Sequence, residues 1–198
     1  MRKVNGENER VKRDYVEYLK EAKGQDEKSI DKVLAAIFRF EESTKFKSFK
    51  KFHKDQARDF KDALALAINP RTKKPLSLTT IDATLRLVKG FFYWLVRKLG
   101  FQKVLSYADV EYFNNNRKDS RAAHALRPIK YPSKDSAYHA FQGMVDQTEM
   151  QRRDKAMFAL VMITGARAAA VASLRLKHVN LIDGYVYQDG REVKTRAS

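Results

Sequence analysis

Residues 164–167 bring together residue types that could hold an anion. They read Thr-Gly-Ala-Arg, between an apolar, helix-like run at 156–163 and a second helix that starts with Ala168-Ala169-Ala170. Glycine permits a tight turn between two helices, and backbone N–H groups at a helix start favour a bound anion. The guanidinium of Arg167 adds a planar fork of donors that matches two oxygens of a phosphate. The pattern predicts a phosphate-binding arginine, the alternative being an ordinary surface arginine after a helix break.

The net charge indicates what the partner would be. Forty Lys+Arg against 24 Asp+Glu give 198 residues a formal charge of +16, and residues 45–103 alone hold 15 of the basic and only 4 of the acidic residues. Such a charge attracts polyanions, so we expect double-stranded DNA as the partner, with an anionic membrane surface as the alternative. A solvated basic surface is the other interpretation, but a surface that only confers solubility usually mixes both signs.

Several classes of site and location are disfavoured by composition. No apolar run is long enough to span a bilayer, and the N-terminus lacks a signal-peptide core, so we expect no membrane association. The chain has no cysteine and four scattered histidines, which leaves no metal-ligand spacing and no expected metal or cofactor. The absence of cysteine also fits a cytoplasmic location.

Helical periodicity dominates the first hundred residues. The best-defined helix is expected from Thr79 as N-cap to Gly100, with Ile81, Leu85, Val88, Phe92 and Leu95 as its buried stripe. A second stripe on this helix is basic and aromatic, with a glycine that would allow close approach to a phosphate backbone; an ordinary solvated face is the alternative. The loop 69–75 before it adds two lysines. The expected DNA-binding residues are Lys73, Lys74, Arg86, Lys89, Tyr93 and Arg97.

The chain is expected to change character after the first hundred residues. Residues 103–132 indicate a break with one short helix near 106–113, so we expect a helical domain at 1–125 and a second domain at 126–198. In the second domain we expect helices from Ser133 and over 149–163. A β-hairpin should follow, with strands at 185–187 and 192–193 around Asp189-Gly190.

These segments together resemble the tyrosine recombinases, the phage integrase family. Thr164-Gly165-Ala166-Arg167 is similar to the family's Thr-Gly-x-Arg box, and residues 174–180, Leu-Arg-Leu-Lys-His-Val-Asn, are similar to its usual continuation. Residues 78–95 resemble the fourth helix of its core-binding domain. The resemblance implies a mainly α fold: a helical, SAM-like core-binding domain, then a truncated mixed α+β catalytic domain with a β-hairpin.

The resemblance also implies a chemistry. Arg167 would hold the non-bridging oxygens of the scissile phosphate, and Lys194 would protonate the departing 5′-oxygen, although an unrelated surface lysine is equally compatible with the sequence. Intact recombinases break and rejoin DNA through a 3′-phosphotyrosyl intermediate, as a homo-tetramer on two duplexes, without a metal or cofactor.

The sequence departs from the family pattern in two places. Ala170 stands where the family usually has an acidic residue that supports the arginine, and the nucleophilic tyrosine is expected beyond Ser198. We therefore expect the 198-residue chain to bind DNA but to be inactive alone. His124-Ala-Leu-Arg127 spells the family's His-x-x-Arg box in the wrong place, and we interpret it as a coincidence. The alternative function is a non-catalytic helical DNA-binding protein, such as a regulator or a nucleoid-type protein.

Overall fold

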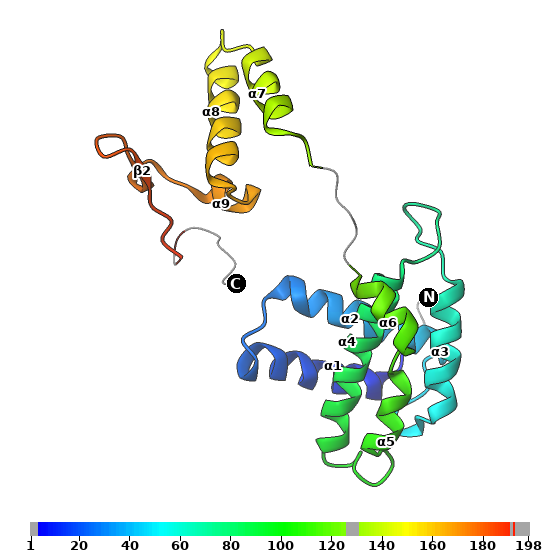
Figure 1. The fold of residues 1–198 in the computed structure, drawn as a ribbon. Helices are drawn as coiled ribbons and strands as arrows, with labels where there is room; N and C mark the ends of the chain where they lie inside the picture. The colour runs from blue at the N-terminus through cyan, green and yellow to red at the C-terminus, as the bar shows by residue number, and fades with distance from the viewer. Residues whose placement is uncertain (1–3, 126–130, 191, 193–198) are drawn as a thin grey trace. The chain divides into compact units, whose positions relative to one another are not determined.

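The computed structural model describes residues 4–125, 131–190 and 192, and these residues are mainly helical, with one small β-hairpin (Figure 1). Their contacts divide the chain into unit 1, Met1–Arg127, and unit 2, Pro128–Ser198. The sequence-based boundary was placed after residue 125. The expectation of a mainly helical fold with a hairpin is confirmed.

Unit 1 consists of helices arranged around α4. Figure 1 shows α4 in the middle of the unit, and α2, α3 and α6 pack against it. Polar residues cap the long helices, since the side chains of Asn5, Asp26, His53 and Ser77 each accept a backbone N–H of the first turn. The elements are α1 (Gly6–Glu17), a π-helical turn (Tyr18–Ala22), α2 (Glu27–Ser43), a 3-10 turn (Phe49–Lys51), α3 (Lys54–Leu66), α4 (Leu78–Arg97), α5 (Tyr107–Val110), a 3-10 turn (Glu111–Phe113) and α6 (Arg117–His124).

The core of unit 1 follows the apolar stripe predicted for α4. Ile81, Leu85, Val88, Phe92 and Leu95 are all buried, as expected from their spacing. Phenylalanines from other elements surround Phe92. Its ring centroid lies 5.1 Å from that of Phe40, 4.6 Å from Phe52 and 5.0 Å from Phe113. These aromatic pairs join α2, α4 and the 3-10 turn before α6 into one core.

A buried polar network ties α1 to the end of α2. The carboxylate of Glu41, which is fully buried, accepts hydrogen bonds from Asn8 Nδ2 at 2.9 Å and from Lys12 Nζ at 2.7 Å. Asn8 also accepts the N–H of Phe49 at 3.0 Å and donates to the carbonyl of Lys47 at 3.0 Å. The network fixes the turn after α2, where two non-glycine residues, Lys45 and Phe46, adopt positive φ.

Two local features of unit 1 differ from the sequence-based expectation. Ser77, not Thr79, caps α4, because its hydroxyl accepts the N–H of Thr80 at 3.2 Å. Thr79 instead donates to the carbonyl of Ala123 at 3.1 Å. The polar stretch that was expected as part of a linker forms α6, and Asn116 caps this helix. The pairing of Thr79 with Ala123 thus fastens α6 to the start of α4.

Gly90 lies opposite α1, and we expect its replacement by alanine to stabilise the protein. A Cβ built at Gly90 would lie 3.8 Å from Tyr15 Oη, which is ordinary van der Waals contact. Gly90→Ala should therefore raise the free energy of unfolding by about 0.5–1 kcal/mol, because glycine inside a helix loses more backbone entropy on folding. Urea denaturation measures this change. Destabilisation, or a clear loss of DNA affinity, would show that the position needs a bare backbone.

Unit 2 consists of helices followed by a small hairpin. The elements are α7 (Lys134–Gly143), α8 (Glu149–Thr164), α9 (Ala168–Ser173), a 3-10 turn (Leu176–His178), β1 (Val179–Asn180) and β2 (Tyr185–Val186). The strands are antiparallel, with Val179 opposite Val186.

The hairpin that the structure describes comes earlier in the chain than the one expected. The hairpin that the structure describes joins β1 to β2, whereas the expected one, around Asp189-Gly190, has its second strand at 192–193, partly outside the described residues. Asn180 Oδ1 accepts the N–H groups of Ile182 and Asp183, each at 3.0 Å, and Gly184 adopts a positive φ of 69°. An Asn side chain that closes the turn and a glycine in the left-handed region explain why the chain turns here.

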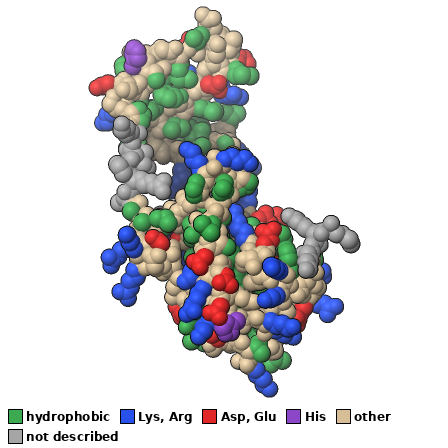
Figure 2. Space-filling model, turned by 90° about the vertical axis from the view of Figure 1, so that its right-hand side faces the viewer, with side chains coloured by type: hydrophobic (Ala, Val, Ile, Leu, Met, Phe, Trp, Pro, Cys, Tyr) green, Lys and Arg blue, Asp and Glu red, His purple; other side chains and the backbone are tan. Residues whose placement is uncertain are grey.

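The described part of unit 2 leaves many apolar side chains uncovered. None of the described residues of α8 is buried, and Ile163 is 85% exposed. Figure 2 shows apolar side chains gathered on the unit 2 part of the surface. The rings of Phe141 and Phe158 stack with their centroids 6.5 Å apart, and this contact joins α7 to α8. The other exposed apolar residues include Met157, Val161, Met162, Leu181 and Ile182.

Candidate nucleic-acid interface

A basic groove of about 810 Å³ lies in unit 1 between α4, α6 and the 3-10 turn that precedes α6. Arg86 and Lys89 reach it from α4, and Arg117 and Arg121 reach it from α6, where their i, i+4 spacing puts them on one face. Arg117 and Arg121 are exposed and form no ion pair with any residue that the structure describes. An unpaired guanidinium can donate to phosphate oxygens without first giving up a protein carboxylate.

Asp82 organises the floor of this groove. Its carboxylate is nearly buried and pairs with Arg86 Nε at 3.3 Å and His124 Nε2 at 3.2 Å. Asn115 Nδ2 lies 3.5 Å from the other oxygen. Asn115 lies just before α6, and His124 is its last residue. Asp82 therefore contacts both ends of the helix that forms one side of the groove. This contact gives His124 a structural role that does not depend on its chance match to the family's His-x-x-Arg motif.

The structure brings only part of the expected DNA-binding set together. Arg86 has a side chain that is 67% exposed and lies at the mouth of the groove. Lys89 is more covered, since its Nζ lies 3.1 Å from Glu111 Oε2 and 2.5 Å from Asn114 Oδ1. Lys73 and Lys74 are exposed in the loop that leads into α4, outside the groove.

Tyr93 and Arg97 lie farther along α4 and contact α5 and the following turn. The hydroxyl of Tyr93 donates to Glu111, and its ring lies 5.8 Å from that of Tyr107. Arg97 Nε donates to Tyr107 Oη at 3.0 Å, and this hydrogen bond raises the pKa of Arg97. The stripe that the sequence placed on one helix face is thus partly occupied by intramolecular partners.

Glu111 is the acidic residue that partners Lys89 and Tyr93, and we expect its neutralisation to strengthen DNA binding. Hydrogen bonds from Lys89 and then Asn114 lower its pKa, so it stays charged at neutral pH, and the contact weakens only as the pH falls through that lowered value. Glu111→Gln breaks the ion pair of Lys89 and removes a charge that repels phosphate. We expect a roughly two- to fivefold higher affinity for duplex DNA at low salt, measured by fluorescence anisotropy.

Glu27→Gln is the matched control for that variant. Glu27 has a side chain that is 88% exposed on α2, and its neutralisation changes the net charge by the same amount. It should leave the affinity nearly unchanged. Equal gains from both variants would show that net charge matters and the groove does not.

The two arginines of α6 are the residues that sequence reasoning missed. Their stretch is polar and short, and among its described residues only Ala123 is buried, so no apolar period marks a helix. A signal was nevertheless present. Asn116 with Asp119 three residues later is a helix-start pattern, and Arg117 and Arg121 follow it at helical spacing.

The Thr-Gly-Ala-Arg box of unit 2 forms a tight turn between α8 and α9. Gly165 ends α8 in the left-handed conformation, with φ of 63° and its N–H bonded to the carbonyl of Val161 at 2.8 Å. Thr164 Oγ1 donates to the carbonyl of Leu160 at 2.6 Å and accepts the N–H of Ala166 at 3.2 Å. Both residues therefore serve the turn, and the turn presents Arg167 as the N-cap residue of α9.

Arg167 is exposed and has no ion pair or side-chain hydrogen bond within the described part of the chain. Ala170, which takes the place of the family's acidic residue, is 3% exposed and has no carboxylate that could orient Arg167. The helix after Arg167 has only six residues, so its dipole adds little. Lys194 lies outside the described residues.

A buried histidine anchors the segment after α9. His178 is 4% exposed, and its Nε2 lies 3.0 Å from Glu192 Oε2, while its Nδ1 accepts the N–H of Arg175 at 3.0 Å. Lys177 also binds Glu192, and these contacts, Lys177 first, lower the pKa of Glu192. The contacts bring Glu192, two residues before the expected Lys194, back to the turn that precedes β1.

Other kinds of site find no support in the described ranges. These residues contain no cluster of His, Cys, Asp or Glu that could hold a metal ion, and none of their helices is long and apolar enough to cross a bilayer. Comparisons with known protein families, curated proteins and solved structures find no match. The assignment of function therefore rests on the residues and their geometry.

Proposed function

We propose that this chain binds double-stranded DNA through its phosphates, as the DNA-binding part of a tyrosine recombinase. The observation that carries the proposal is the groove of unit 1, where Arg117 and Arg121, beside Arg86, form no ion pair with a described residue, in a chain of charge +16. Phosphate contacts of this kind fix a protein on a duplex without reading its sequence. Unit 1 would then be the SAM-like core-binding domain.

In this proposal Arg167 of unit 2 contacts the phosphate at which strands are broken and rejoined in the intact enzyme. Its support is an exposed guanidinium with no partner among the described residues, held by a turn that uses both Thr164 and Gly165. A planar bidentate donor suits a phosphate whose charge grows in the transition state. Lys194 would be the proton donor to the leaving oxygen.

The second candidate function is a DNA-binding protein without catalytic chemistry, and Ala170 is the observation that favours it. In the described ranges no carboxylate orients Arg167, and catalysis requires a precisely held guanidinium. In that case the groove of unit 1 alone would account for the binding, and Arg167 would be one surface charge among many.

Paired binding assays separate these possibilities. The chain should shift a duplex of about 30 base pairs and bind anionic vesicles much more weakly at equal salt. Arg167→Ala should reduce DNA affinity by about five- to tenfold, whereas Arg152→Ala, an exposed arginine on α8, should reduce it less than twofold. Equal small effects would favour the second candidate function, and stronger binding to vesicles would refute the DNA proposal.

A further inference from the structure

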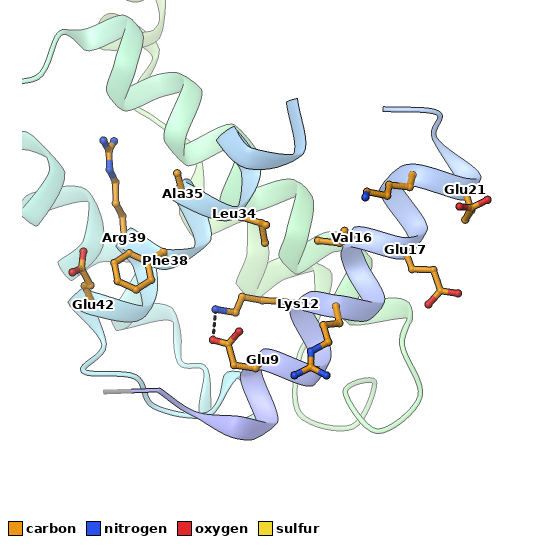
Figure 3. A pocket seen from close by; sticks show the side chains of 12 residues that line it. Glu9, Lys12, Val16, Glu17, Glu21, Leu34, Ala35, Phe38, Arg39 and Glu42 are labelled. Atoms are coloured by element: carbon orange, nitrogen blue, oxygen red, sulfur yellow. Dashed lines mark ion pairs between the residues drawn. The ribbon is translucent and has the colours of Figure 1, made fainter. Parts of the chain in front are cut away.

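A second groove, of about 820 Å³, lies between α1 and α2 (Figure 3). Its floor is apolar: Val16, Leu34 and Phe38 are half-buried, and Ala35 is exposed. Figure 3 shows Val16 and Leu34 between the two helices, with charged side chains around them. Two helices with an open apolar seam between them present a surface that another helix, or helix pair, could cover.

The rim of this groove carries both signs of charge in balance. Lys12 is already paired with Glu9 at 2.6 Å and with Glu41 at 2.7 Å. The other rim charges include Arg13, Arg39, Glu17, Glu21 and Glu42, none of which forms an ion pair with a described residue. The rim therefore offers both halves of intermolecular ion pairs.

The segment around the groove is neutral in an otherwise basic chain. Residues 1–43 contain ten Lys+Arg and ten Asp+Glu, although the whole chain has a charge of +16. Two copies of such a chain repel each other wherever basic surfaces meet, and least where the surface is neutral. A twofold contact brings the same patch together from both copies, so it requires a patch that is complementary to itself.

We propose that the groove between α1 and α2 is a dimer interface, whose occupant is the same helix pair of a second copy. The two apolar seams would face each other as in a four-helix bundle, and the arginines of one rim would meet the glutamates of the other. The basic groove at α4 and α6 is lined by different residues, so dimerisation leaves it accessible.

Sedimentation equilibrium of the full chain tests this interface. Wild type should weigh twice the 22.9 kDa of one chain, and Ala35→Arg should weaken the dimer by about 100-fold, because an unpaired guanidinium would be buried in an apolar contact. Ala65→Arg, at an exposed alanine of α3, is the matched control and should remain dimeric.

Cross-linking gives a second readout that does not depend on folding defects. The chain has no cysteine, so Ala35→Cys carries a single thiol and should form a cross-linked dimer under mild oxidation, whereas Ala65→Cys should not. A monomeric wild type at up to about 100 µM would overturn the proposal and leave the groove to a different partner. A dimer that survives Ala35→Arg but is lost in Ile163→Glu would also overturn it, because unit 2 would then form the contact.

Discussion

Replacing Arg86, Arg117 and Arg121 together with glutamine should lower the affinity of the chain for duplex DNA by about 100-fold near 0.1 M salt. The three side chains line one groove, and each phosphate that they neutralise releases condensed counterions. The plot of log affinity against log salt should therefore become shallower by about three units, close to one for each lost contact. Fluorescence anisotropy at several salt concentrations measures both quantities.

The control for this variant removes the same charge from a different surface. Lys23, Lys28 and Lys32 are exposed in the neutral segment 1–43 and do not line the groove between α1 and α2, and their replacement by glutamine also lowers the net charge by three. That control should lose less than about fivefold in affinity, since distant exposed charges are screened. If both triple variants lose the same affinity, the groove is not the binding site and only net charge attracts the DNA.

Glu41→Ala should lower the free energy of unfolding by about 3–5 kcal/mol, the largest loss that we expect from a single substitution. Glu41 is fully buried, and its removal leaves Asn8 Nδ2 with only the carbonyl of Lys47 as acceptor and the ammonium of Lys12, itself 9% exposed, with Glu9 alone. The carbonyl and amide contacts of Asn8 that fix the turn after α2 would weaken with it. Urea denaturation followed by circular dichroism measures the change.

The double variant Lys12→Met with Glu41→Leu tests whether Glu41→Ala destabilises the protein by leaving the buried ammonium of Lys12 without its main partner or by leaving a cavity. Replacing a buried ion pair by apolar residues is often neutral, so the double variant should recover most of the stability. Failure to recover would mean that the turn contacts of Asn8, and not the charge pair, stabilise this region. Burial lowers the pKa of Lys12, but its bonds to Glu41 and Glu9 raise it more. This stabilisation is therefore complete below the ordinary value of 10.5 and is lost as the pH rises through the raised value.

The sequence predicted those elements whose apolar residues recur at the helical period. The core stripe of α4 is buried as expected, and a helix was expected where α8 lies, because both are long and bounded by clear turn residues. Helix α6 was missed because it is short and nearly all polar. Of the four Lys and Arg residues that line the groove, two lie on α6, so the sequence predicted only half of the candidate site.

The pairing of charges across elements was the other part that periodicity could not predict. Lys89 and Tyr93 lie on an apparently free face of α4, yet Glu111, 18 residues beyond Tyr93, partners both. The turn between β1 and β2 is a similar case, because the side chain of Asn180 closes it by accepting the N–H groups of Ile182 and Asp183. Such choices depend on contacts between side chains that a spacing rule does not contain.

The salt dependence of wild-type binding to a duplex of about 30 base pairs tests the central claim most directly. If the basic groove and Arg167 contact phosphates, log affinity should fall linearly with log salt, with a slope steeper than about −3. Binding should be tight at about 50 mM salt and weak at about 200 mM. A slope near zero, or no binding to duplex DNA even at about 50 mM salt, would contradict the account.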